Sequence, residues 1–178
     1  MVLGISGEYN TGMIRDRHDE ESRRIHIRLR CVIVHEEKLL VTYTKDGDFY
    51  FFPGGHMQWG ESIIEGCQRE IREELGDDVE FEFEKVLYMT EFIEPNKEKH
   101  SHEIFVLGRV NKSEELDGKM DPEHPDGSFW TTWLELDNLP DNLYPTTLAK
   151  QIAKEYKIGF PSQGEYFEPT KAGKARQQ

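Results

Sequence analysis

The sequence predicts an α/β protein, because segments that alternate like strands are interleaved with two segments that carry helical periodicity. From residue 24 onward, RIHIRLRCVIVHE alternates polar and apolar side chains and then becomes apolar, which is typical of a strand that enters a core. Residues 62–75 and 146–156 instead repeat apolar side chains at intervals of three and four, which predicts helices. A chain of 178 residues without internal repeats fits one domain.

The remaining strands follow from the same alternation and from turn residues. KLLVTYT is predicted as the second strand of a hairpin, after the charged turn HEEK. The Asp-Gly pair in KDGD predicts a turn before the short strand FYFF. Two long strands, FEFEKVLYMTEFIE and HEIFVLGRV, flank the turn PNKEK, and FWTTWLEL is a further strand. The acidic stretch 111–127, rich in Gly and Pro, predicts a long loop.

The first predicted helix has signals at both ends. Ser62 and Glu65 form a capping-box pattern, and Gly76 occupies the position where a left-handed C-terminal residue is expected. Apolar side chains at helical spacing predict the buried stripes of the two helices: Ile64, Cys67, Ile71 and Leu75 in the first, and Leu148, Ile152 and Tyr156 in the second.

The composition limits the cellular location and the classes of binding partner that we expect. The net charge of −13 argues against sequence-independent nucleic-acid binding, which relies on Lys and Arg. A polyanionic small substrate would need a metal ion or a local basic cluster to overcome this charge. No apolar run reaches the length of a membrane-spanning helix, and the N-terminus does not resemble a secretion signal, so we expect a cytoplasmic protein. Cys31 and Cys67 are predicted to be small buried thiols.

The most informative segment is an acidic helix with a glycine-containing loop before it. Glu70, Glu73 and Glu74 lie at i, i+3 and i+4, so their carboxylates project from one helical face and repel each other. Oxygen ligands at this density suit a hard cation such as Mg²⁺ or Mn²⁺. A solvated acidic helix face would give the same pattern. The surroundings favour a site, since Arg69 is placed to brace a carboxylate.

At these positions the chain resembles the Nudix box, whose pattern is Gly, five residues, Glu, seven residues, and then Arg-Glu-apolar-x-Glu-Glu-x-Gly-apolar. The last apolar position is Asp77 here, with Val79 as a stand-in. The looser resemblance to MutT-like members covers roughly residues 24–156. Eight residues match the box in register: Gly55, Glu61, Arg69, Glu70, Ile71, Glu73, Glu74 and Gly76.

The resemblance implies an α/β/α sandwich around a central mixed β-sheet, with the box as a loop-helix-loop catalytic motif. It implies that Glu70, Glu73 and Glu74 bind Mg²⁺ or Mn²⁺ with help from the Gly55 carbonyl, and that Glu61 and Arg69 hold the loop and helix in place. The resemblance implies that residues 23–160 are the Nudix hydrolase domain. Residues 1–22, which are polar and aperiodic, are predicted to be a loose N-terminal arm, and residues 161–178, which lack apolar periodicity, a disordered tail.

Other candidate residues come from the chemistry of phosphoanhydride hydrolysis, in which water attacks phosphorus and a carboxylate accepts its proton. Glu73 and Glu74 are candidate bases in the box. Arg28 and Arg30 are candidate substrate-binding residues on the first strand, or else surface charges. His102 is expected to be structural, because the sequence places no second His or Cys to complete a metal site. Further candidates are the loop acids Glu114, Glu115 and Glu123 as bases, and Tyr50, Trp59 and Trp130 as base-stacking or core aromatics.

The resemblance implies a small-molecule nucleotide substrate, a nucleoside diphosphate linked to another group. A MutT-like nucleoside triphosphate pyrophosphohydrolase is the first hypothesis. An ADP-ribose or nucleotide-sugar pyrophosphatase is the alternative; Pro95 lies close to where ADP-ribose-cleaving members carry a proline, eighteen residues after Asp77 rather than about sixteen after the box. A non-catalytic nucleotide-binding Nudix module is the alternative of another class, and the intact acids of the box argue against it. A homodimer is left open.

Overall fold

The structure is a computed structural model that describes residues 25–93 and 99–166. The predicted N-terminal arm and Pro95 lie outside the described residues. The elements, in chain order, are β1 (Ile25–His35), β2 (Lys38–Thr44), β3 (Phe49–Phe51), α1 (Ile63–Leu75), β4 (Phe81–Ile93), β5 (His100–Val110), the 3₁₀ turn η1 (Ser113–Glu115), β6 (Phe129–Glu135), the 3₁₀ turn η2 (Leu136–Asn138), β7 (Leu143–Tyr144), α2 (Thr146–Ile158) and β8 (Glu165–Tyr166).

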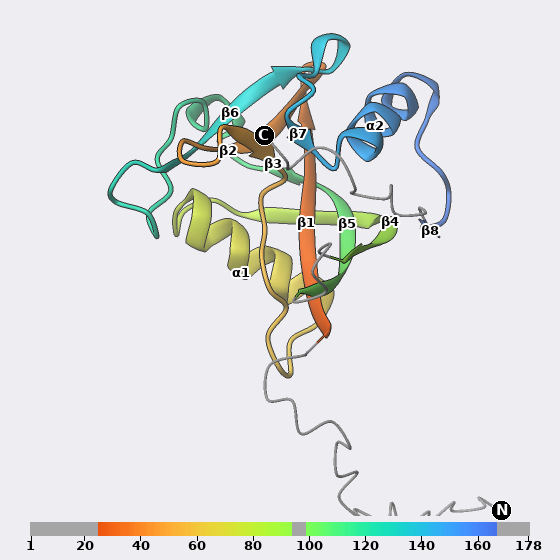
Figure 1. Cartoon of the computed structure of the whole chain (residues 1–178), viewed down its shortest axis with the longest axis horizontal. Coiled ribbons are helices and arrows are strands. Elements are labelled where there is room, and N and C mark those ends of the chain that lie inside the picture. The colour runs from red at the N-terminus through yellow and green to blue at the C-terminus, as the bar shows by residue number, and fades with distance from the viewer. Residues whose placement is uncertain (1–24, 94–98, 167–178) are drawn as a thin grey trace, which may run out of the picture.

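The described strands form one mixed, curled sheet in the order β7-β3-β2-β1-β5-β4-β8, with β6 paired to β2. β1 and β5 run parallel over nine residue pairs, whereas β4 and β5 form an antiparallel hairpin. β1 pairs with β2 only at its C-terminal end, through Val34 and His35. The sheet therefore opens beside the N-terminal half of β1, where the loop after β3 takes the place of a strand (Figure 1).

The two helices cover opposite faces of this sheet (Figure 1). Alternate residues of β1 separate the two cores, because neighbouring side chains of a strand point to opposite faces. Leu29, Cys31 and Ile33 pack with the apolar side of α1, and Val32 belongs to the core that α2 covers. The prediction of an α/β/α sandwich with a mixed sheet is confirmed.

The ends of α1 agree with the sequence at one end and differ at the other. The Ser62 side chain accepts a hydrogen bond from the Glu65 N–H, and the Glu65 carboxylate accepts one from the Ser62 N–H, which completes the predicted capping box. Gly76, at φ 109° and ψ 150°, has the positive φ expected of glycine but lies outside the left-handed helical region. The expected left-handed cap was therefore wrong, because the chain leaves the helix in an extended conformation.

The buried stripes also differ from the prediction at their ends. Ile64 is 42% exposed and Tyr156 37% exposed, so neither residue belongs to the buried stripe of its helix. Two carboxylates, Glu70 and Glu74, share the buried side of α1 with its apolar residues. Val79, 0% exposed, packs in the α1 core, so it does replace Asp77 at the end of the box.

Several helices and strands begin or end a few residues away from their predicted boundaries. β5 begins at His100, two residues before the predicted strand, and α2 continues to Ile158. The short strands β7 and β8 were not predicted, because two-residue pairings leave no periodic pattern in the sequence. β8 pairs with β4 and lies within the segment 161–178 for which the sequence predicts a disordered tail, and residues 167–178 lie outside the described part.

Candidate active site

The loop between β3 and α1 runs along the open edge of β1 and carries the first residues of the site. The Leu29 N–H donates to the Gly55 carbonyl at 2.8 Å, and the Cys31 N–H donates to the Pro53 carbonyl at 2.8 Å. One bond further along, the Met57 N–H donates to a β1 carbonyl at 3.0 Å. These backbone bonds fix the loop beside the sheet, so its position does not depend on side chains alone.

Two consecutive glycines allow this loop to pass close to its neighbours. Gly54 has φ 120°, and a Cβ there would stand 2.5 Å from the Leu29 carbonyl oxygen. A Cβ on Gly55 would stand 2.5–2.9 Å from the carboxylate atoms of Glu70. The space beside Glu70 therefore exists only because residue 55 has no side chain.

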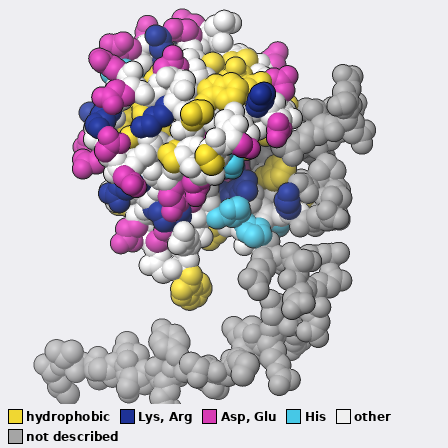
Figure 2. All heavy atoms as spheres, turned by 90° about the vertical axis from the view of Figure 1, so that its left-hand side faces the viewer, with side chains coloured by type: hydrophobic (Ala, Val, Ile, Leu, Met, Phe, Trp, Pro, Cys, Tyr) yellow, Lys and Arg dark blue, Asp and Glu magenta, His cyan; other side chains and the backbone are white. Residues whose placement is uncertain are grey.

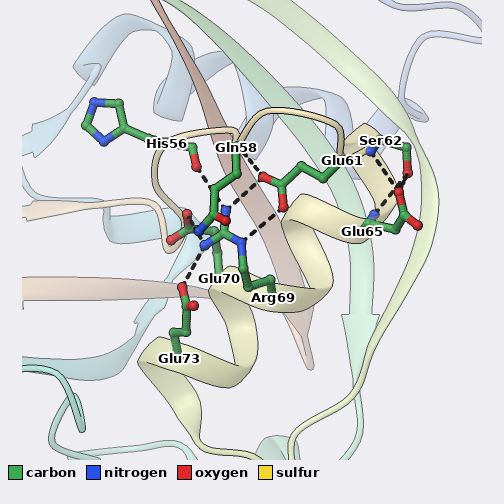
Figure 3. A network of polar contacts seen from close by, with 8 residues as sticks. All are labelled: His56, Gln58, Glu61, Ser62, Glu65, Arg69, Glu70 and Glu73. Atoms are coloured by element: carbon green, nitrogen blue, oxygen red, sulfur yellow. Dashed lines mark hydrogen bonds and ion pairs between the residues drawn. The ribbon is translucent and has the colours of Figure 1, made fainter.

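Arg69 joins four groups that the sequence placed in the box (Figure 3). Its guanidinium forms two hydrogen bonds with Glu61, at 2.8 and 3.0 Å, and also donates to Glu70 at 2.8 Å and Glu73 at 2.6 Å. A further bond of 2.9 Å reaches the His56 carbonyl. Arg69 thus offsets part of the repulsion among the acids and ties the loop to α1.

Glu74 lies apart from this network and is buried. Its carboxylate accepts a hydrogen bond of 2.9 Å from the Gly54 N–H. Burial raises the pKa of Glu74 to about 8, opposed by the Gly54 bond and assisted by the charges of Asp121 and Glu70. Near neutral pH the buried carboxyl group of the metal-free protein therefore favours its protonated form.

Glu70 and Glu73 differ in their exposure. Burial raises the pKa of Glu70 above its ordinary value, and Arg69 opposes this shift, whereas the charges of Glu73 and Glu123 assist it. The Glu73 side chain is 38% exposed, against 9% for that of Glu70. The three glutamates of the helix face are therefore not equivalent: Glu73 is partly exposed, Glu70 is buried beside Arg69, and Glu74 is buried without a bond to Arg69.

The donor set fits a divalent cation. Two buried carboxylates that carry like charges and have raised pKa values are stabilised as anions when a cation lies between them. The Gly55 carbonyl already accepts one hydrogen bond and keeps a second lone pair. Carboxylate and carbonyl oxygens are the ligands that hard cations prefer. Glu70, Glu73, Glu74 and the Gly55 carbonyl are therefore the residues that could hold the metal.

Arg28 and Arg30 have different environments although both extend from β1. Arg30 donates to the Gly54 carbonyl at 3.2 Å and forms an ion pair of 3.1 Å with Glu103, and its side chain is only 12% exposed. Arg28 is more accessible and donates to the His56 ring at 3.2 Å. Burial, and then the neighbouring Arg30, lower the pKa of Arg28. Arg30 therefore supports the loop, and Arg28 has the more open position.

A group of basic residues surrounds Arg28 in this acidic protein. The His26 and His56 rings meet edge to face at 5.1 Å, and burial lowers the pKa of His56. Figure 2 shows Asp and Glu side chains over much of one face and His side chains gathered beside Lys and Arg near its lower edge. His26 was expected on the same strand face as Arg28 and Arg30, whereas His56 was not predicted here, since it meets β1 only through the folded loop.

Only one of the predicted loop acids is brought into electrostatic range of the acid cluster. The charge of Glu123 raises the pKa of Glu70, whereas no such effect on the box is found for Glu114 or Glu115, which are exposed. The loop also brings Asp121, which is buried and bonded to His124 at 3.0 Å, and its charge acts on Glu74. Sequence reasoning missed Asp121 because an acid in an acidic loop carries no distinguishing pattern.

The three candidate aromatic residues lie in different environments. Trp59 is fully exposed at the tip of the loop, so core packing was wrong for this residue. Tyr50 and Trp130 each pack against Tyr43, at 4.8 and 4.6 Å between ring centroids. Both cysteines are buried and free, as predicted, and a hydrogen bond with Cys67 and burial raise the pKa of Cys31.

Comparison with known proteins agrees with this arrangement. The profile of the NUDIX domain matches residues 25–154, which is most of the chain. The chain belongs to the NUDIX domain family. The sequence-based assignment to the Nudix family is confirmed at the level of the family.

Solved structures share the fold at low sequence identity. An ADP-ribose pyrophosphatase from Streptococcus suis is 19% identical, with a TM-score of 0.57 over 81% of this chain and 100% of that chain. A MutT NUDIX hydrolase from Burkholderia pseudomallei is 23% identical, with a TM-score of 0.59 over 72% of this chain and 97% of that chain. A UDP-X diphosphatase is 20% identical, with a TM-score of 0.59 over 80% and 67% of the two chains. Among the described residues of this Nudix protein, no helix is long and apolar enough to cross a membrane.

Proposed function

We propose that this chain is a Mg²⁺-dependent Nudix hydrolase that cleaves a phosphoanhydride bond in a nucleoside diphosphate linked to another group. The observation that carries the proposal is the pair of buried carboxylates on α1, Glu70 and Glu74, beside the glycine loop. A solvated acidic helix face would leave both exposed, and their burial with raised pKa values is typical of a functional site.

Glu70, Glu73, Glu74 and the Gly55 carbonyl hold the metal in this proposal, and Mn²⁺ could replace Mg²⁺. The bound cation supplies charge stabilisation for the phosphate oxygens and lowers the pKa of water. Water attacks phosphorus, and a carboxylate of the box accepts its proton. Glu73 and Glu74 are the candidates for this base in the box, and Glu73 is the more exposed of the two. Glu61 and Arg69 keep the loop and helix in register.

In this proposal Arg28 provides positive charge that attracts the phosphate groups of the substrate. The site must attract a polyanion in a protein with a net charge of −13. The guanidinium of Arg28, with His56 beside it, offers hydrogen-bond donors to phosphate oxygens. Arg30 stays a positioning residue, because its donors are engaged by the Gly54 carbonyl and Glu103.

A nucleoside triphosphate is the first candidate substrate, as in MutT-like members. ADP-ribose or a nucleotide sugar is the second candidate, and it is favoured by the structural likeness to an ADP-ribose pyrophosphatase and a UDP-X diphosphatase. Both classes present the same diphosphate to the metal and differ in what leaves. The cytoplasmic location and a homodimer stay predictions.

The test is a panel of nucleoside triphosphates, ADP-ribose and nucleotide sugars, each incubated with Mg²⁺ and with excess chelator. Products are separated by ion-exchange chromatography. We expect a nucleoside monophosphate with pyrophosphate from a triphosphate, or with a sugar phosphate from the second class. Turnover that persists in chelator would contradict the metal requirement. Binding of nucleotides without turnover of any would favour the non-catalytic module.

A further inference from the structure

A second group of metal-ligating side chains lies on the β4–β5 hairpin and shares no residue with the acid cluster. It consists of Glu91 on β4 and His100 and His102 on β5. Each side chain offers one ligand atom, and the three atoms lie within 4.8 Å of one another. The sequence-based expectation that His102 has no histidine partner was therefore wrong, because His100 falls two residues earlier in the same strand.

The sheet register explains why these three side chains meet. Side chains two residues apart on a strand point to the same face, so His100 and His102 are neighbours. Glu91 stands directly opposite His102 in the antiparallel pair of β4 and β5. The two imidazole rings are stacked with centroids 5.4 Å apart, and Glu91 Oε1 lies 3.7 Å from His102 Nε2. The hairpin backbone thus holds the ligands together without help from a loop.

One nitrogen atom of this group, His100 Nε2, is inaccessible to solvent and has no hydrogen-bond partner among residues 25–93 and 99–166. Buried polar side-chain atoms almost always have one, and an exception points to a water molecule or an ion. In the sheet His100 pairs with Ile93 of β4 and with Ile25 of β1, and the polar side chains near its ring are those of His102 and Glu91. A cation ligated by Nε2 would give this atom the partner that the protein does not provide.

The chemistry of the ligands indicates which cation would bind. Two imidazoles and one carboxylate suit Zn²⁺ and similar transition-metal ions, whereas Mg²⁺ prefers oxygen ligands alone. Three protein ligands leave a fourth position for water. We propose that Glu91, His100 and His102 form a site for Zn²⁺ or a chemically similar divalent transition metal, distinct from the Mg²⁺ site proposed on α1.

The histidines and the acid cluster need to be tested separately, in the full-length protein freed of metal. Saturating Mg²⁺ is added first, so that oxygen-rich sites are filled, and Zn²⁺ is then titrated by calorimetry. Co²⁺ replaces Zn²⁺ in a parallel titration, because its visible absorption reports nitrogen ligands in a four-coordinate site. We expect one Zn²⁺ per chain and a Co²⁺ spectrum of this kind.

The variants His100→Gln and His102→Gln should each weaken Zn²⁺ binding more than about tenfold, since each removes a ligand. His35→Gln is the matched control, because His35 lies at the opposite end of β1 from these residues and should bind Zn²⁺ as the wild type does. Unchanged binding in the double variant His100→Gln/His102→Gln would overturn the proposal. So would loss of binding in Glu70→Gln with both histidine variants unaffected, which would assign the cation to the acid cluster.

Nuclear magnetic resonance of the wild type makes the test independent of whether the variants fold. The imidazole ¹⁵N signals are recorded during the Zn²⁺ titration, again in excess Mg²⁺. We expect the signals of His100 and His102 to shift together, with that of His35 unchanged. Zn²⁺ that leaves both signals unchanged, or a wild type that binds no Zn²⁺, would overturn the assignment.

Discussion

The N–H of Gly54 donates a hydrogen bond of 2.9 Å to the buried carboxylate of Glu74, and no other hydrogen bond to this carboxylate is found among the described residues. Burial outweighs this bond, so the pKa of Glu74 is raised to about 8. A raised pKa in a folded acid means that the protonated form stabilises the fold. The bond therefore holds a carboxyl group that favours its protonated form beside the glycine loop. A cation bound there would instead stabilise its ionised form.

Stability of the metal-free protein should fall as the pH rises. The stabilising contribution of Glu74 is complete below its ordinary pKa of about 4.5 and is lost as the pH approaches 8. The slope for one proton is about 1.4 kcal/mol per pH unit, and Glu70 adds to it with the same sign. Thermal unfolding in chelator between these pH values measures the effect. Glu74→Gln should flatten the profile, and an equally steep profile in this variant would show that other groups cause it.

Saturating Mg²⁺ should raise the melting temperature, and more so at pH 8 than at pH 6. A ligand that binds only the folded state stabilises it by mass action, and carboxylates must lose their protons to bind a metal. Scanning calorimetry with and without Mg²⁺ at the two pH values gives the comparison. A shift that is larger at pH 6 would contradict metal binding by Glu74.

Gly55→Ala should lower kcat about tenfold or more with little effect on stability. The new Cβ would meet the Glu70 carboxylate at 2.5–2.9 Å, and this carboxylate would have to move away from the loop. Gly159→Ala is the contrasting control. Residue 159 has φ 97° with open space around it, so alanine there should cost stability through its backbone and leave kcat unchanged. Normal kcat for Gly55→Ala would mean that the position of Glu70 is unimportant.

Arg69→Lys should lower both stability and kcat. The Arg69 guanidinium donates hydrogen bonds to Glu61, Glu70 and Glu73 at once, and an ammonium group cannot make all of these bonds. The repulsion among the three carboxylates is then no longer offset. We expect a loss of about 1–3 kcal/mol in the free energy of unfolding in urea. Arg72→Lys, an exposed change on the same helix, should have little effect. Equal effects of the two variants would remove the bracing role from Arg69.

The spacing of residues in the sequence was sufficient to predict the first helix and its acidic face. Ser62 and Glu65 predicted the start of α1, and the spacing of Glu70, Glu73 and Glu74 predicted one acidic face. Both properties are local, because they depend on helical geometry over a few turns. The spacing did not predict that Glu73 stays partly exposed while Glu70 and Glu74 are buried, since burial depends on where the loop and β1 lie.

Long-range contacts account for what was missed. His56 meets Arg28 because a loop occupies the open edge of the sheet, and Arg30 meets Glu103 because β1 pairs with β5 in parallel. Neither pairing can be read from positions that are 28 and 73 residues apart in the chain. The surface expectation for Arg30 was wrong for the same reason.

Glu123→Gln should lower kcat less than about tenfold if the base lies in the box. Glu123 is exposed and acts on Glu70 only through its charge, so its removal changes the field at the site without removing a ligand. Glu114→Gln, in the same loop, provides the comparison. A loss for Glu123→Gln as large as that for Glu70→Gln would place the base in the loop.

The most direct measurement is kcat for Glu70→Gln and Glu74→Gln in saturating Mg²⁺, on whichever nucleotide the panel identifies. Loss of a group that stabilises transition-state charge costs about a hundred- to a thousand-fold in rate, and we expect at least this for each variant with the fold intact by circular dichroism. Glu80→Gln, an exposed acid outside the cluster, should keep the wild-type rate. Near-normal rates for both Glu70→Gln and Glu74→Gln would contradict the placement of the catalytic metal site on this face of α1.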